Sequence, residues 1–168
     1  MAKRKLITPK QKMGRRSRNK GATFERWVSA QLKQYFPDSR RQPQSQIKQL
    51  KQIASHTPEF NPCLTDVVAG PFGIECKHRK VLPPINRTLE QAAEDCGESG
   101  KIPVAIHKPH GGTAHDIQVG ILYGGDILIL PWLEFIRNCE RIAREHQREQ
   151  EGDRIPGTIP VLDLPRGD

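Results

Sequence analysis

The sequence predicts an α/β domain in which helices pack against one mixed β-sheet. Segments with helical spacing alternate with short β-branched apolar runs, in the order helix, two hairpin strands, helix, strand, strand pair, helix. The Gly70–Pro71 step separates two of these apolar runs and is a strong turn signal. The chain has 168 residues, of which 35% are apolar, so it has the size of one domain and can bury a core.

The first helix is predicted to begin near Asn19, where Asn19 or Ser17 could cap it, and to end at Pro37. Its apolar residues recur at three- and four-residue steps: Phe24, Trp27, Val28, Leu32 and Tyr35 or Phe36. We therefore expect Phe24 and Trp27 to lie in the core and not to stack on a ligand.

Residues 40–62 are polar, rich in glutamine and interrupted by three prolines. A short helix from about Gln46 to Ser55 is compatible with the positions of its few apolar residues. We expect this stretch to be an inserted, mobile segment that lies over a surface, because long connections of this kind are often functional or disordered.

The remaining elements follow from turn signals and apolar runs. A hairpin is expected over Leu64–Ala69 and Phe72–His78, and a helix over Arg87–Ser99 with Asn86 or Thr88 as its cap and Gly97 or Gly100 at its end. Strands at 101–108, 116–123 and 126–131 come next, and Pro131 begins the last helix. The predicted domain thus covers residues 19–146, between a basic, flexible arm (1–18) and an irregular tail (147–168) rich in Pro and Gly.

The positive charge is concentrated at the start of the chain. There are 27 Lys and Arg against 19 Asp and Glu, for a net charge of +8. Residues 1–20 carry nine bases and no acid, whereas residues 81–168 carry nine bases and fourteen acids. This distribution is typical of a protein that binds a polyanion, most simply nucleic acid, and the alternative is a solvated basic tail.

The four cysteines form no CxxC pair, which argues against a zinc ribbon and leaves a structural zinc module as a remote alternative. The chain shows neither the apolar region of a secretory signal nor a membrane-spanning stretch. We therefore expect packed thiols in a protein of the reducing cytoplasm, with no membrane partner.

The predicted hairpin carries the residues best suited to chemistry. Side chains alternate along a strand, so Glu75 and Lys77 share one face, and the hairpin can bring Asp66 close to them. Two neighbouring carboxylates repel each other, and Mg²⁺ or Mn²⁺ would relieve this repulsion, with the Cys76 carbonyl as a further ligand. Lys77 could then orient a water or stabilise charge on a phosphate. The alternative is an exposed strand with an ordinary ion pair.

Four segments carry a resemblance to a known family: RNKGATFER (Arg18–Arg26), TDVV around Asp66, IECK with Glu75 and Lys77, and the helix TLEQAA followed by KIPVAIHK. Together they resemble the PD-(D/E)xK nuclease superfamily and, within it, the Holliday junction resolvases of archaeal and phage type. Thr65 stands where the family usually has a proline. The resemblance implies a restriction-endonuclease-like mixed sheet flanked by helices.

The resemblance also implies roles for individual residues. Asp66 and Glu75, the carbonyl of Cys76 and the helix carboxylate of Glu25 would hold the metal, Lys77 would be the catalytic lysine, and Gln91 would face the site. DNA contacts would come from a larger set: Arg15, Arg16, Arg18, Lys20, Arg40, Arg41, Ser45, His78, Arg79 and Lys80.

The expected function is that of a Mg²⁺-dependent endodeoxyribonuclease acting on four-way junctions or other branched DNA. Paired nicks in a two-fold junction need two active sites, so the resemblance implies a homodimer. Two alternatives stay open: a nuclease of the same superfamily that cuts flaps, ends or linear duplex, and a basic nucleic-acid-binding protein without catalysis.

Overall fold

The computed structural model describes the backbone of residues 9–150 and the side chains of residues 18–145. The helices are α1 (Pro9–Leu32), α2 (Gln44–His56), α3 (Ile85–Cys96) and α4 (Trp132–Gln150), with a 3-10 helix at Ala114–Asp116. The strands are β1 (Arg40–Arg41), β2 (Val67–Ala69), β3 (Phe72–Arg79), β4 (Ile102–Pro109), β5 (Gln118–Tyr123) and β6 (Asp126–Pro131).

Within these described residues, six strands form one mixed sheet in the order β1-β2-β3-β4-β5-β6. Among the described strand pairs, β3–β4 alone is parallel, and α3 makes the crossover between these two strands. The β2–β3 hairpin turns at Gly70, whose φ of 49° is a left-handed conformation that glycine adopts without strain. The predicted α/β class with a mixed sheet flanked by helices is therefore confirmed.

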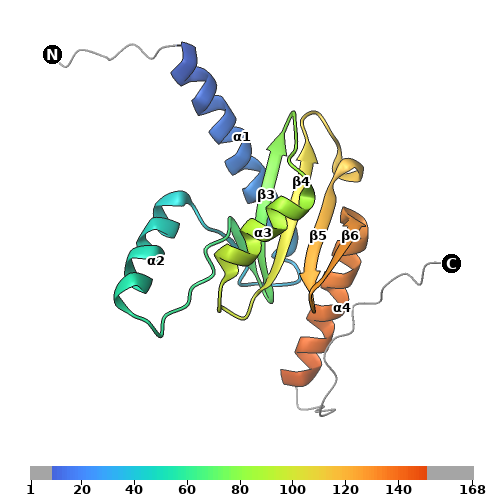
Figure 1. Cartoon of the computed structure of the whole chain (residues 1–168). Coiled ribbons are helices and arrows are strands. Elements are labelled where there is room, and N and C mark those ends of the chain that lie inside the picture. The colour runs from blue at the N-terminus through green and yellow to red at the C-terminus, as the bar shows by residue number, and fades with distance from the viewer. Residues whose placement is uncertain (1–8, 151–168) are drawn as a thin grey trace.

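The helices cover the two faces of the sheet unequally (Figure 1). α3 packs on one face, where a Cβ atom on Gly120 would lie 3.0 Å from side-chain atoms of Ile85 and Leu89. α1 and α4 pack on the other face and share its core with alternate residues of β3, including Phe72 and Ile74. Side chains of β3 that point away from this core therefore point toward α3.

The core on the α1 and α4 face is rich in aromatic residues, as the spacing of the first helix predicts. Phe24 is buried, and Trp27 packs against the core with its ring centroid 5.2 Å from that of Trp132. Phe72 of β3 joins the segment that follows α1 to α4, with ring centroids 5.8 Å from Phe36 and 5.5 Å from Phe135. These contacts hold α1 and α4 together on this face of the sheet.

Two helix starts differ from the predictions. α1 begins at Pro9 instead of near Asn19. The polar residues 9–18 extend the helix, and this part of α1 projects away from the sheet (Figure 1). The predicted start near Asn19 was thus wrong, since residues 9–18 belong to α1, and residues 1–8 of the expected arm lie outside the described part. α3 is preceded by Pro84, without a side-chain cap from Asn86 or Thr88, because Pro84 already has an extended backbone that opens the helix.

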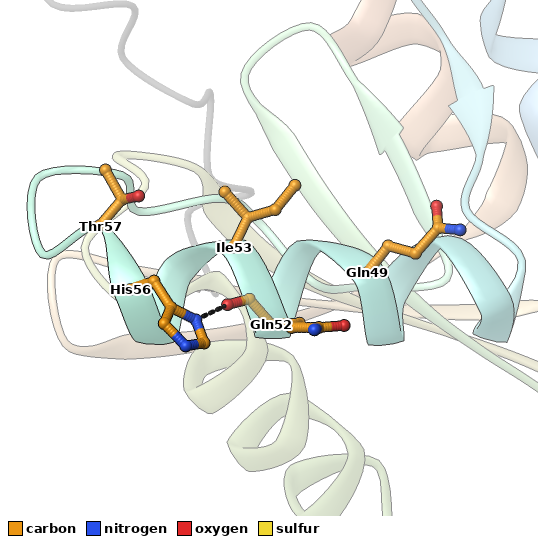
Figure 2. Close-up of a pocket in the computed structure, with 5 residues that line it drawn as sticks. All are labelled: Gln49, Gln52, Ile53, His56 and Thr57. Atoms are coloured by element: carbon orange, nitrogen blue, oxygen red, sulfur yellow. Dashed lines mark hydrogen bonds between the residues drawn. The ribbon is translucent and has the colours of Figure 1, made fainter.

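The segment 40–62 contains more regular structure than the sequence predicts. β1 pairs with β2 at the edge of the sheet, with Arg41 opposite Val67. The short helix is confirmed as α2, which Lys51 links to Asp95 of α3 by an ion pair of 3.7 Å. The outer side of α2 carries a shallow hollow lined by Gln49, Gln52, Ile53, His56 and Thr57 (Figure 2).

All four cysteines are buried and free, so the expectation of packed thiols is confirmed. Cys63 and Cys96 meet above Gly73 of β3 with their sulfur atoms 3.7 Å apart. A Cβ atom on Gly73 would lie 2.4 Å from the Cys96 sulfur and 2.6 Å from the Cys63 sulfur. The close approach of α3 to β3 therefore requires glycine at this position.

Gly73→Ala is expected to lower the free energy of unfolding by about 1–3 kcal/mol, because the added methyl group overpacks a filled core. Thermal melting followed by circular dichroism should show a clear decrease in Tm, and the double variant with Cys96→Ala should recover part of it. Gly21→Ala is the matched control, because the nearest atom to its added Cβ would be Glu25 Oε1 at 3.6 Å, an ordinary van der Waals distance. A Gly73→Ala protein as stable as the parent would contradict this packing.

Candidate active site

Glu75 of β3 faces α3 and is the most deeply buried carboxylate of the hairpin, with 3% of its surface exposed. Burial raises the pKa of Glu75 to about 8, the nearby Asp66 carboxylate adds to this rise, and Lys77 opposes it. A buried carboxylate of this kind is costly to leave uncompensated, and such groups occur preferentially at functional sites.

Lys77 and Gln91 compensate Glu75 in a closed triangle of hydrogen bonds. The Lys77 Nζ donates to Glu75 Oε2 and to Gln91 Oε1, each at 3.1 Å. The Gln91 Nε2 donates to the same Glu75 oxygen, also at 3.1 Å. Strand alternation places the lysine two residues after the glutamate on one face, and α3 places Gln91 above both. The structure thus brings together the three residues that the sequence indicates for this face.

Asp66 lies directly before β2 and reaches the adjacent strand. Its Oδ2 accepts a hydrogen bond of 3.1 Å from the backbone N–H of Cys76. β2 pairs with β3 only as far as Ile74, so Cys76 lies beyond the end of the hairpin ladder. The N–H and C=O of one strand residue face the same edge, so the Cys76 carbonyl also faces the edge where Asp66 lies. Asp66 and this carbonyl are therefore neighbours, as predicted.

Glu25 of α1 approaches the same edge from the other face of the sheet. Its Oε2 accepts a hydrogen bond of 2.5 Å from the Arg41 Nε, which forms an ion pair. Burial raises the pKa of Glu25, the hydrogen bond from Arg41 lowers it, and the Asp66 carboxylate raises it. Arg41 is thus the ion-pair partner of a site carboxylate, a role that the sequence does not indicate because Arg41 lies on a strand that the sequence does not predict.

The remaining basic residues of the predicted set lie apart from this triangle. Arg18, Lys20, Arg40, Arg79 and Lys80 are exposed, as is Ser45 at the start of α2. Arg15 and Arg16 lie on α1, outside the described side chains. His78 packs on the α1 face, with its ring centroid 5.5 Å from that of Phe24. The predicted DNA contacts are therefore distributed around the site and over both faces of the sheet.

His107 is a further buried polar residue next to the triangle, and the sequence assigns it no part in this site. β3 and β4 pair in parallel with Lys77 opposite His107, so both side chains lie on the α3 face. Its Nε2 lies 2.8 Å from the Thr88 hydroxyl of α3. Burial and the charge of Lys77 both lower the pKa of His107, so its neutral form is favoured beside the lysine.

The donor set at this edge suits a hard divalent cation. Asp66 and Glu75 supply carboxylate oxygens, and the Cys76 carbonyl supplies a third oxygen. Mg²⁺ commonly binds through one or two carboxylates and keeps several waters, so two side chains suffice. Among the described side chains, no group of three or more His, Cys, Asp and Glu is placed to hold a metal ion, so Glu25 does not form such a group with Asp66 and Glu75.

Within the described part of the chain, none of the helices is both long enough and apolar enough to cross a bilayer. Comparison of the chain with models of known protein families, with curated proteins and with solved structures gave no match.

Proposed function

We propose that this protein is a metal-dependent endodeoxyribonuclease with a preference for branched DNA such as four-way junctions. The observation that carries the proposal is the meeting of Asp66, Glu75 and Lys77 at one edge of the hairpin, with Gln91 hydrogen-bonded to two of them. This arrangement combines oxygen ligands for a cation with an amine beside them, which is the chemistry that hydrolysis of a phosphodiester requires.

The residues have distinct roles in this proposal. Asp66, Glu75 and the Cys76 carbonyl would hold Mg²⁺ or Mn²⁺, and Glu25 would hold its waters. The cation, when bound, supplies a polarised phosphate and a more acidic water. Lys77 Nζ lies 3.1 Å from Glu75 Oε2 and would stabilise negative charge that develops on the scissile phosphate. Gln91 keeps the Lys77 ammonium and the Glu75 carboxylate in fixed positions, so we assign it as a positioning residue.

The choice of branched DNA rests on the resemblance to Holliday junction resolvases, and the net charge of +8 supports a nucleic acid substrate. Symmetric nicks need two active sites related by a two-fold axis, so the proposal includes a homodimer in solution. The cytoplasm is the proposed compartment.

The test is cleavage of end-labelled four-way junction, flap and linear duplex DNA in Mg²⁺ or Mn²⁺, with the Glu75→Ala protein in parallel. Symmetric nicks in the junction alone, absent with the variant, are the expected result. Cleavage of flaps or linear duplex would keep the nuclease and reject the junction preference. Tight binding without cleavage of any substrate would favour the non-catalytic DNA-binding alternative.

Ca²⁺ is expected to allow binding without efficient cleavage, because its longer and more flexible coordination misplaces the reacting groups.

A further inference from the structure

A second pocket lies on the opposite face of the sheet, between α1 and the C-terminal ends of the parallel strands β3 and β4. It has a volume of about 350 Å³, and Lys20, Trp27, His78 and Lys108 are among the residues that line it. The register of β3 and β4 places His78 opposite Lys108, just as it places Lys77 opposite His107 on the α3 face. Successive residues of both strands therefore supply the active site on one face and this pocket on the other.

The pocket concentrates positive charge, and Asp116, whose carboxylate interacts with the charge of Lys108, lies outside its lining. No acidic residue lines it, and none of the ion pairs among the described side chains includes Lys20 or Lys108. The Lys20 Nζ lies 3.5 Å from His110 Nε2, and the rings of His110 and His78 lie 5.9 Å apart.

Aromatic rings form the back wall of the pocket. Phe24 and Trp27 stack with their centroids 5.9 Å apart, and the Lys108 Nζ lies 6.0 Å and 5.9 Å from these two centroids. The rings hold the ammonium group in place and exclude water from one side of it, which strengthens its attraction for an anion. Asn19 and Thr23 add neutral polar side chains to the lining.

We propose that this pocket binds a backbone phosphate of the DNA strand, beyond the phosphate that is cut. The identity of the strand as substrate rests on the proposed nuclease function, whereas the binding of a phosphate rests on the pocket alone. Lys77 and His78 are adjacent in β3, so a strand passing over the end of the sheet can contact both faces. This proposal makes Lys108 a DNA-binding residue, although it is distant in sequence from the basic N-terminal residues.

The test compares the wild type with Lys108→Gln, Lys20→Gln and the control Lys33→Gln, which removes one exposed lysine remote from the pocket. Binding of a labelled four-way junction in Ca²⁺ is measured over a series of salt concentrations. Each pocket variant is expected to weaken binding and to reduce the slope of log K against log [salt] by about 1, while the control leaves both unchanged. Lys20 is exposed, so its variant remains informative if Lys108→Gln fails to fold.

Inorganic phosphate provides a second arm without DNA. It is expected to shift the indole N–H resonance of Trp27 in the wild type and not in Lys108→Gln. A shift with phosphate but an unchanged DNA salt slope in both variants would mean that the pocket binds a free anion, and it would overturn the proposal. The proposal would also be overturned if the variants left the DNA salt slope unchanged and phosphate caused no shift of the Trp27 resonance.

The two proposals fail in different ways. If the wild type cleaves DNA and both pocket variants bind DNA as it does, the pocket proposal is wrong and the nuclease stands. If nothing is cleaved but the pocket variants lose affinity and salt slope, the pocket binds DNA and the nuclease proposal is wrong.

Discussion

Replacing Asp66 by Asn or Glu75 by Gln is expected to reduce DNA cleavage by far more than about 100-fold. Loss of a residue that only supports a metal ligand usually costs about 10–100-fold, and a lost ligand should cost more. Either change removes a charged oxygen ligand and so weakens the proposed cation site. Both variants keep the size of the native side chain, and the Asn and Gln amides can retain part of the hydrogen bonding to Cys76, Lys77 and Gln91. DNA binding in Ca²⁺ should therefore survive in both.

The measurement is single-turnover cleavage of the preferred DNA, with affinity determined separately. Glu94→Gln is the control, because Glu94 is an exposed carboxylate on α3 and has no partner role in the triangle. Wild-type rates in both Asp66→Asn and Glu75→Gln would show that this edge of the hairpin is not the active site.

Thermal stability gives a readout of the cation site that does not depend on activity. Mg²⁺ is expected to raise the Tm of the wild type, since a ligand that binds only the folded state stabilises it by RT ln(1 + [L]/Kd). The increase should disappear in Asp66→Asn and Glu75→Gln. Equal increases in all three proteins would place Mg²⁺ elsewhere.

Replacing Lys77 by Met is expected to reduce cleavage by about 100–1000-fold, the usual cost of losing one charged group that stabilises the transition state. Methionine keeps most of the aliphatic chain, so packing between β3 and α3 should persist. The loss should appear in kcat, because the lysine acts on charge that develops during the reaction.

Gln91→Leu separates positioning from catalysis at the same triangle. It leaves the Lys77 ammonium present but removes the hydrogen bonds to Lys77 and Glu75. We expect a smaller loss of about 10–100-fold, again in kcat with little change in KM. A loss as large as that of Lys77→Met would indicate that Gln91 contacts the reacting phosphate directly. An increase in KM with kcat unchanged would indicate that Gln91 acts in substrate binding.

Local physics explains which features of the fold the sequence predicts. The turn at Gly70 and the apolar runs beside it define the β2–β3 hairpin, because turn chemistry and strand alternation depend on near neighbours. The same alternation is sufficient to place Glu75 and Lys77 on one face. Helical spacing likewise predicts that Phe24 packs into the core, which it does.

Local patterns are therefore sufficient to predict the α/β class, the hairpin and the shared face of Glu75 and Lys77. The resemblance indicates Gln91 as a site-facing residue, but its hydrogen bonds to Lys77 and Glu75 are seen in the fold alone. The fold also reveals that Arg41 pairs with Glu25 through an unpredicted edge strand and that Lys108 lies beside His78. The physical reason is that these contacts join residues distant along the chain. Their positions depend on the parallel register of β3 and β4 and on the docking of α1 and α3, which local spacing does not encode.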